Sequence, residues 1–303
     1  MLFFSRKLRT VRDCVRYGER QFNKAALSYG HGTGNAFDEA SFIVLETLGL
    51  PVDALYDHWK HVLSSTESEK VRSMIAARIE TRKPASYLLN KAYIRQYPFY
   101  VDERVIVPRS FIGEILCNQM EGEITSSFLD SREDAAAVLD LCTGSGCLAI
   151  IAAELFRDAK VDAVDLSPDA IAIARRNVTA YSLEDTISLY EGDLFTPLTG
   201  KKYDVIISNP PYVDAQAMDE LPVEFRHEPR IALASGFDGL DIVRRILKDS
   251  ILYLNDGGGL LCEIGRGRSI LVEEFPNLPF LWLDTEESSG EVFWITKEQL
   301  SGR

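Results

Sequence analysis

The chain has 303 residues, enough for one large domain or two ordinary ones, and its composition of 46% apolar and 26% charged residues is ordinary for a globular protein. Acidic residues outnumber Lys and Arg by 46 to 33, which gives a formal charge of -13. An acidic surface repels nucleic acid phosphate unless a local basic patch overrides it, and it would attract a basic protein instead.

The cysteines and the apolar runs argue against several other classes of protein. Five scattered cysteines do not form a disulfide framework. Cys142 and Cys147 lie five residues apart without the second pair that a zinc site needs, so we expect no metal. No run approaches the roughly 20 apolar residues of a membrane-spanning helix, and the first residues lack the apolar core of a signal peptide. We therefore expect a cytoplasmic protein without membrane contact.

Residues 1–92 have the pattern of a small helical domain. Apolar residues recur at helical spacing over 10–27, and a second helical stretch over 35–50 ends at a glycine and a proline. Thr66 and Glu69 match a capping box, and the apolar residues that follow mark one face of a third helix. Pro84 is expected to end it.

The pattern changes from residue 93 onward. Residues 94–108 alternate and are rich in aromatic and β-branched residues, which predicts a short hairpin, and the polar residues 121–135 are a plausible bridge. We therefore assign 93–130 to a β-hairpin and linker.

Residues 131–303 alternate between near-continuous apolar strands and helices, which predicts a parallel sheet covered on both faces. The last two strands, within 278–285 and 291–296, are joined too closely for a helical crossover and must pair antiparallel. The predicted fold class is α/β, a Rossmann-like sheet with a reversed C-terminal β-hairpin, preceded by a smaller helical domain.

A glycine turn joins the first of these strands to a helix in the sequence DLCTGSGCLA, residues 140–149. Gly144 and Gly146 would let the backbone approach a ligand at a helix N-terminus. With Ala149 they also match the dinucleotide fingerprint, which is a weak signal by itself.

Polar residues follow four successive strands of the predicted sheet, namely Asp140, Asp165, Asp193 and Asn209. Each alone is more simply a turn or cap residue, but four in register predict a nucleoside-sized groove outside the carboxyl ends of the strands. Asp165 could accept from both ribose hydroxyls. Asp193 could accept from an adenine amino group, with Leu194 or Phe195 against the ring.

The tetrapeptide NPPY, residues 209–212, interrupts the chain directly after the fourth strand. Its prolines fix φ and remove two N–H donors, so the Asn209 side-chain oxygen and the Pro210 carbonyl can both accept from one planar –NH₂ group. Tyr212 supplies an aromatic wall that also suits a cationic methyl donor. The loop therefore indicates methylation of an amide or amino nitrogen.

NPPY together with DLCTGSG resembles the S-adenosylmethionine-dependent amino-methyltransferases, and the resemblance extends over nearly the whole chain. The stretches 29–40, 98–116 and 221–247 resemble the PrmB-like branch of the HemK-type protein-glutamine methyltransferases. This resemblance implies transfer of a methyl group from S-adenosylmethionine to a glutamine side-chain amide of large-subunit ribosomal protein number three, the uL3 type, which would be a basic partner.

The resemblance also implies roles for individual residues. Gly144 and Gly146 would line the methionine part of the cofactor, Asp165 the ribose and Asp193 the adenine edge. Asn209, Pro210 and Tyr212 would hold the glutamine amide, and the helical domain would contact the protein substrate. The full set of expected cofactor residues is Asp140, Thr143, Gly144, Gly146, Asp165, Leu166, Asp193, Leu194 and Asn209.

Two residues depart from the family pattern. Cys142 stands where many methyltransferases have the first glycine of the turn, and Asn90 ends a stretch that often ends in glycine. Asn tolerates the left-handed conformation, so we expect a cost to stability rather than a loss of function. His31 and His227 are best read as structural residues, and Arg109 either orders a hinge or touches the substrate.

Other functions remain open from the sequence. Methylation of the GGQ glutamine of a release factor would keep the mechanism and change the partner. A DNA amino-methyltransferase would need a basic cleft, and the net charge argues against DNA binding. An NAD oxidoreductase leaves NPPY without a role, and a non-catalytic ribosome-assembly module leaves Asn209 unexplained. The oligomeric state is not indicated.

Overall fold

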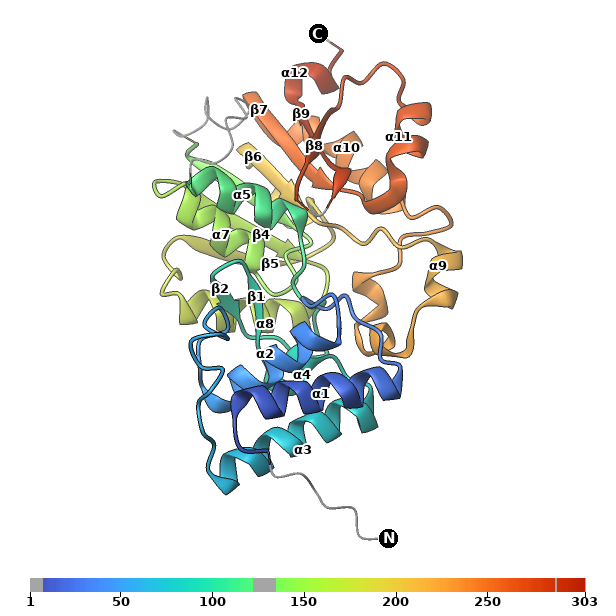
Figure 1. The fold of residues 1–303 in the computed structure, drawn as a ribbon. Coiled ribbons are helices and arrows are strands. Elements are labelled where there is room, and N and C mark those ends of the chain that lie inside the picture. The colour runs from blue at the N-terminus through green and yellow to red at the C-terminus, as the bar shows by residue number, and fades with distance from the viewer. Residues whose placement is uncertain (1–7, 122–134, 287, 303) are drawn as a thin grey trace. The chain divides into compact units, whose positions relative to one another are not determined.

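The computed structural model describes residues 8–121, 135–286 and 288–302, and its elements are shown in Figure 1. The chain divides into two compact units. The helical unit comprises Met1–Ala92 and Leu221–His227. The second unit comprises Tyr93–Glu220 and Glu228–Arg303, and we name it the catalytic unit because it contains the residues expected to form the site. The expected domain boundary at 130/131 lies outside the described residues.

The described part of the helical unit contains four helices and one short 3-10 helix. Their bounds are α1 Val11–Ala25, α2 Ala36–Leu48, α3 Ser65–Thr81, α4 Ala85–Leu89 and η2 Val223–His227. Each longer helix turns its apolar stripe inward, where Phe22, Ile43 and Ile75 are among the fully buried side chains.

Helix α3 begins two residues earlier than expected. The capping box predicted at Thr66 and Glu69 is wrong, because Ser64 is the N-cap and Glu67 completes the box. The motif S/T-x-x-E occurs twice in this stretch, and the earlier start lengthens the helix by two residues and their backbone hydrogen bonds. Asn90 does adopt the left-handed conformation that was expected of it, with φ of 52° at the end of α4.

The segment 221–227 belongs to the helical unit although it follows the NPPY loop in sequence. Glu224 is buried and accepts from Arg82 at 2.9 Å and from the Ser28 backbone N–H at 3.1 Å. The His227 ring lies 3.1 Å from the Thr81 carbonyl oxygen. His227 therefore has a structural contact here, as its sequence context suggested.

Phe225 of the same segment packs on the turn between α1 and α2. Its ring centroid lies 4.1 Å from that of His31, and Gly30, with φ of 117°, leaves room for it. Nearby, the buried Arg78 donates to Glu39 at 2.8 Å. The stretch 29–40 and the first part of the stretch 221–247, residues 221–227, thus meet within the helical unit.

A small two-stranded sheet, β1 Ala92–Ile94 and β2 Tyr97–Phe99, lies at the start of the catalytic unit. The predicted hairpin is therefore confirmed, but it is shorter than the alternating residues 94–108 from which it was predicted, because 100–108 form no strand. The strands of the unit's main sheet are β3 Ala137–Leu141, β4 Lys160–Asp165, β5 Ile187–Glu191, β6 Tyr203–Ser208, β7 Leu254–Glu263, β8 Leu281–Asp284 and β9 Ser289–Thr296. Its helices are α5 Phe111–Glu121, α7 Cys147–Leu155, α8 Pro168–Ala180, α9 Ala215–Glu220, α10 Asp241–Tyr253, α11 Arg268–Glu274 and α12 Lys297–Leu300, with 3-10 helices η1 Thr196–Leu198, η3 Arg230–Ala232 and η4 Gly265–Gly267.

The seven strands of this sheet run in the order β5-β4-β3-β6-β7-β9-β8. The first five are parallel to one another, whereas β9 pairs antiparallel with both β7 and β8. This topology confirms the predicted Rossmann-like sheet with a reversed C-terminal hairpin.

Strand residues alternate between two apolar layers, so both faces of the sheet are covered. Val205 and Ile207 of β6 join the core that includes α5 and α7, whereas Ile206 joins the core that includes α10. This double burial is why the strands have continuous apolar sequences. In the part of the chain that the structure describes, no helix is both long and apolar enough to cross a membrane.

We predict that Ser64→Ala lowers the free energy of unfolding by about 1 kcal/mol, because Ser64 accepts from the Glu67 backbone N–H at the start of α3. The matched control is Thr66→Ala, which removes a hydroxyl two residues later from an exposed position. Urea denaturation measures both. Equal losses in the two variants would contradict the observed capping position.

Candidate active site

The glycine turn between β3 and α7 is shaped by backbone hydrogen bonds. The Thr143 N–H donates to the Val164 carbonyl at 3.0 Å, and the Gly146 N–H donates to the Thr143 carbonyl at 2.9 Å. Gly146, with φ of 80°, packs so closely on Ala174 that a Cβ would lie 3.2 Å from its methyl group. Cys142 adopts a φ of 61°, so this residue carries the strain that a glycine would avoid.

Asp140 lies beneath this turn and is fully buried. Its Oδ2 accepts from the Thr143 hydroxyl at 2.5 Å and from the Ala149 N–H at 3.1 Å, which ties the turn to the first turn of α7. Oδ1 has no hydrogen-bond partner among the described residues. Burial raises the pKa of Asp140 to about 7.

Asp165 ends β4 beside the same turn. Its Oδ2 accepts from the Gly144 N–H at 2.8 Å and its Oδ1 accepts from the Ser167 N–H at 2.9 Å. Each carboxylate oxygen keeps a further lone pair, so the group can still accept from two hydroxyls. Burial raises the pKa of Asp165 above its ordinary value. Leu166 follows with 54% of its side chain exposed, an apolar surface at the edge of the sheet.

Asp193 lies after β5 and is engaged in a way that the sequence did not indicate. Its Oδ2 pairs with the Arg245 guanidinium at 2.7 Å, and both side chains are about half exposed. Leu194 is buried in a left-handed conformation with φ of 49°. Phe195 is buried and stacks on Tyr253 at 4.5 Å, so of the two residues considered for the adenine ring Phe195 is committed to the core.

These residues fit S-adenosylmethionine. A Cβ on Gly144 would meet only Ile106, at 3.9 Å, so the backbone of the turn borders open space. The Asp165 oxygens retain acceptor capacity for a ribose, and the exposed Leu166 offers apolar surface for a purine. No group of His, Cys, Asp and Glu side chains that could hold a metal occurs among the described residues.

The NPPY loop leaves β6 next to the glycine turn, because β6 and β3 are neighbours in the sheet. Ser208 anchors the end of β6 by donating to the Leu141 carbonyl at 3.0 Å. Pro210 is buried, and Asn209 is half-buried. The Asn209 side chain makes no hydrogen bond to any residue that the structure describes, so its amide is available to a ligand.

Tyr212 is fixed by contacts with residues that are distant from it in the sequence. Its hydroxyl donates to Glu263 Oε1 at 3.0 Å. A Cβ on Gly265 would lie 2.7 Å from its ring, and a Cβ on Gly239 would lie 2.4 Å from its carbonyl oxygen. Both glycines have positive φ, so each is needed for conformation and for space.

Glu263, at the end of β7, links the NPPY loop to the start of α5. Its Oε2 accepts from the Ser110 hydroxyl at 2.7 Å and from the Phe111 N–H at 3.0 Å. The side chain is fully buried, and burial raises its pKa to about 7. Sequence reasoning missed this residue. The available signal was a carboxylate that ends the apolar run of β7.

Arg109 lies just before the residues that contact Glu263, and its side chain orders this part of the chain. Its guanidinium forms a bidentate pair with the buried Glu228, with the Nη2 to Oε2 distance at 2.7 Å. Glu228 Oε1 also accepts from the Val107 N–H at 2.9 Å. Of the two roles considered from the sequence, the contacts favour the ordering of the hinge.

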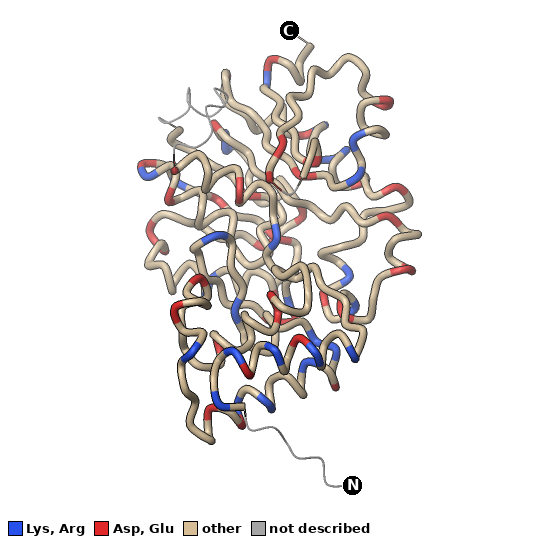
Figure 2. Tube along the Cα trace, viewed as in Figure 1, with Lys and Arg blue, Asp and Glu red and all other residues tan. Residues whose placement is uncertain are grey.

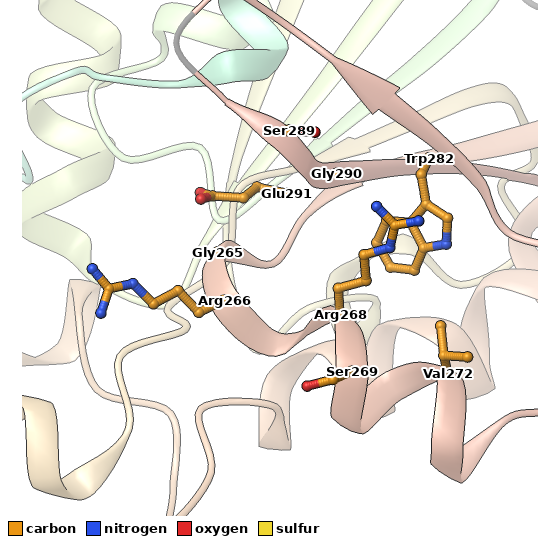
Figure 3. Close-up of a pocket in the computed structure, with 9 residues that line it drawn as sticks. All are labelled: Gly265, Arg266, Arg268, Ser269, Val272, Trp282, Ser289, Gly290 and Glu291. Atoms are coloured by element: carbon orange, nitrogen blue, oxygen red, sulfur yellow. The ribbon is translucent and has the colours of Figure 1, made fainter.

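A pocket of about 580 Å³ lies between η4, α11 and the β8–β9 hairpin (Figure 3). Figure 3 shows Arg268 beside Trp282, and its guanidinium carbon lies 4.8 Å from the indole centroid. None of the residues expected from the sequence to form the site lines this pocket. Gly265 does line it and also packs on the Tyr212 ring, so the pocket borders the NPPY loop.

We predict that Asp140→Asn reduces the loss of stability as the pH rises from about 4 to about 7. The folded-state pKa of Asp140 is raised, so over this range the folded state holds a proton that the unfolded state has released, and stability falls as pH rises. Unfolding free energies measured across this range test the difference. Asp219→Asn, at an exposed position, is the control, and an unchanged slope in Asp140→Asn would contradict the prediction.

The methyltransferase small domain family model matches residues 123–236. Among solved structures, the catalytic domain of hMettl16 in complex with an RNA hairpin aligns over 78% of this chain and 83% of that chain, with 16% identity and a TM-score of 0.47.

Curated relatives align over almost the full chain. The ribosomal protein uL3 glutamine methyltransferase of Bradyrhizobium diazoefficiens is 51% identical over 97% of this chain and 92% of its own length. The enzymes of that name from Burkholderia pseudomallei and Neisseria meningitidis are 48% and 47% identical, over 96% and 98% of this chain and 96% of their own lengths. This chain therefore belongs to the family of ribosomal protein uL3 glutamine methyltransferases.

Proposed function

We propose that this protein transfers a methyl group from S-adenosylmethionine to the side-chain amide nitrogen of a glutamine in ribosomal protein uL3, as a PrmB-like enzyme. The observation that carries the proposal is the Asn209 amide, which has no partner among the described residues and follows the strand beside the glycine turn. The names of the curated relatives support the same substrate.

The loop addresses the main difficulty of the reaction, which is the poor nucleophilicity of an amide nitrogen. Its lone pair is delocalised, and the amide rotation barrier of roughly 18–20 kcal/mol measures that resonance. The Asn209 side-chain oxygen and the Pro210 carbonyl accept from the two hydrogens of the substrate –NH₂. They hold the nitrogen in one orientation and stabilise positive charge as it develops.

The bond changes balance without a strong base. S-adenosylmethionine supplies a methyl group on a sulfonium leaving group, so the nitrogen–carbon bond forms as the sulfur–carbon bond breaks. Asn209 and Pro210 orient the amide during transfer, and the nitrogen then loses one proton to water. His227 is not required, which agrees with its contact to Thr81 in the helical unit.

The cofactor would be held by the edge of the sheet. Thr143, Gly144 and Gly146 would line its methionine part, with Asp140 holding the turn from below. Asp165 would bind the ribose, and Leu166 would cover the purine. Asp193 pairs with Arg245 through one carboxylate oxygen. Its second oxygen would accept from the adenine amino group, beside Leu194.

The charge of the catalytic unit suits a basic protein substrate. Residues 93–220 and 228–303 contain 35 Asp and Glu against 18 Lys and Arg. A surface of this sign increases the association rate of a positively charged partner at low ionic strength. The helical unit, as the substrate-recognition domain, would contact the rest of the substrate.

We expect Asn209→Ala to lower the rate of uL3 methylation by about 10²–10³, by analogy with the loss of one oxyanion-hole donor, while cofactor binding is retained. Transfer of radiolabel from S-adenosylmethionine to purified uL3 measures the rate. Asn277→Ala, at an exposed position in the loop before β8, is the matched control.

The same assay with a release factor and with duplex DNA identifies the acceptor. Label on uL3 that is lost in Asn209→Ala supports the proposal. Label on the release factor alone would retain the mechanism and replace the partner. Label on DNA alone, or none despite cofactor binding, would overturn the proposed function.

We also expect Glu263 to act through Tyr212. Glu263→Ala should lower kcat about 10- to 100-fold, because the ring of Tyr212 loses its anchor, as when an outer-shell partner of an active-site group is removed. Glu263→Gln should recover most of the rate, since its carbonyl can face Ser110 while its –NH₂ donates to the Tyr212 hydroxyl.

A double-mutant cycle checks this coupling. In a Tyr212→Phe background, Glu263→Ala should cost much less than in the native chain. Ser110→Ala, which removes a different hydrogen bond to Glu263, is the control and should change kcat only a few-fold. Fully additive losses in folded, cofactor-binding variants would show that Glu263 does not act through Tyr212.

A further inference from the structure

Charge is divided unevenly along the chain. Residues 1–92 contain 14 Lys and Arg against 10 Asp and Glu, although the whole chain has a formal charge of -13. The helical unit is therefore net positive in an acidic protein. A local concentration of positive charge is the condition under which an acidic protein can still bind a polyanion.

Four basic residues, Arg12, Arg16, Arg20 and Lys24, follow one another at intervals of four residues along α1. All four are exposed. On a helix this spacing places them on one face, each about 6 Å further along the axis. In Figure 2 the Lys and Arg segments recur along the helix that Figure 1 labels α1.

Most of this row has no acidic partner. Arg16 pairs with Glu19 at 2.8 Å, but Arg12, Arg20 and Lys24 form no ion pair with any residue that the structure describes. Like charges four residues apart repel each other and destabilise a helix. The row therefore costs some stability in the isolated protein, and an anionic ligand would remove that cost.

Aromatic and basic side chains border the row at the N-terminal end of α1. The Arg12 N–H donates to the Trp59 carbonyl at 3.2 Å, which fixes this loop beside the helix. The Arg16 guanidinium lies 6.0 Å from the Trp59 ring. Tyr56 is 77% exposed, and Lys60 is also exposed. Trp59 is half-buried, so Tyr56 is the exposed ring of this pair. Basic residues beside an exposed aromatic ring are typical of surfaces that bind RNA.

The alternative of an anionic membrane fits less well. A helix that lies in a membrane interface needs an exposed apolar face opposite its basic face. The apolar residues of α1, including Val11, Val15 and Phe22, are instead buried in the core of the helical unit. Only its charged face meets solvent, and phosphate groups of a nucleic acid match that face.

We propose that the basic ridge, formed by Arg12, Arg16, Arg20, Lys24 and Lys60, binds the phosphate backbone of ribosomal RNA. The choice of ribosomal RNA rests on the proposed function, because a ribosomal protein substrate is assembled on such RNA. The ridge recruits the enzyme to RNA that carries uL3, whereas the acidic catalytic unit and the remaining surface of the helical unit meet the protein itself.

The test uses the full chain and a fluorescein-labelled fragment of large-subunit ribosomal RNA. Binding is followed by anisotropy from about 50 to 200 mM salt. In the triple variant Arg12→Gln, Arg20→Gln, Lys24→Gln, we expect the slope of log K against log salt to fall by about 2, at about 0.7 per lost contact, and the affinity near 0.1 M salt to fall about 100-fold.

The control variant changes the same charge elsewhere. Arg157→Gln, Arg175→Gln and Lys248→Gln neutralise three exposed basic residues of the catalytic unit and should leave the slope unchanged. Equal losses in both triple variants, or no RNA binding by the native chain, would overturn the proposal. Binding of the native chain to phosphatidylglycerol vesicles but not to RNA would overturn it in favour of a membrane.

Methylation separates this proposal from the proposed function. The ridge variant should methylate free uL3 at the native rate and should methylate an RNA–uL3 complex at least 10-fold more slowly at limiting enzyme. Equal rates of the ridge variant and the native enzyme on the complex would overturn the role in recruitment. Absence of label on uL3 with the native enzyme would overturn the proposed function, while the anisotropy result stands by itself.

Discussion

Buried carboxylates that accept from backbone N–H groups of neighbouring loops hold the edge of the sheet together. Asp140 binds the start of α7, Asp165 binds the glycine turn, Glu228 binds the chain before α5, and Glu263 binds the first residue of α5. The backbone N–H groups of these loops have no hydrogen-bond partners in a helix or a sheet. Buried carboxylates therefore accept their hydrogen bonds and fix the loops in position.

This arrangement has an energetic consequence. A carboxylate in a dry environment favours its proton, and the pKa values of Asp140 and Glu263 are raised to about 7 by burial. The donors that surround them only partly offset this cost. The protein therefore gives up stability near neutral pH at the place where the glycine turn and the NPPY loop are held in fixed positions, which is common at functional sites.

In the proposed function, the two units would divide the recognition of the substrate by charge. The catalytic unit is acidic, and the helical unit carries a row of exposed basic residues on α1. A single surface of one sign could attract only one component of a particle made of basic protein and anionic RNA. The segment 221–227 follows Tyr212 in the chain but belongs to the helical unit, where Glu224 is buried. The two units are therefore connected by the chain on both sides of this segment.

The sequence by itself determined the features that depend on local periodicity and on short spacing. Continuous apolar strands predicted the parallel sheet, the short last connection predicted the antiparallel hairpin, and NPPY after the fourth strand predicted the chemistry. These signals are local because alternation, turn residues and strand ends are read within a few residues.

Tertiary structure alone decided the contacts between distant parts of the chain. The partner of Tyr212 lies 51 residues away at Glu263, the partner of Asp193 lies 52 residues away at Arg245, and Arg109 meets Glu228 across 119 residues. No periodicity links such pairs, since they meet only after strands and helices have packed. The start of α3 was local but degenerate, because two overlapping capping patterns compete within six residues. The strand order places the hydrogen-bond acceptors of the predicted site along the carboxyl ends of the parallel strands. The long-range contacts decide which of these acceptors can still bind a ligand.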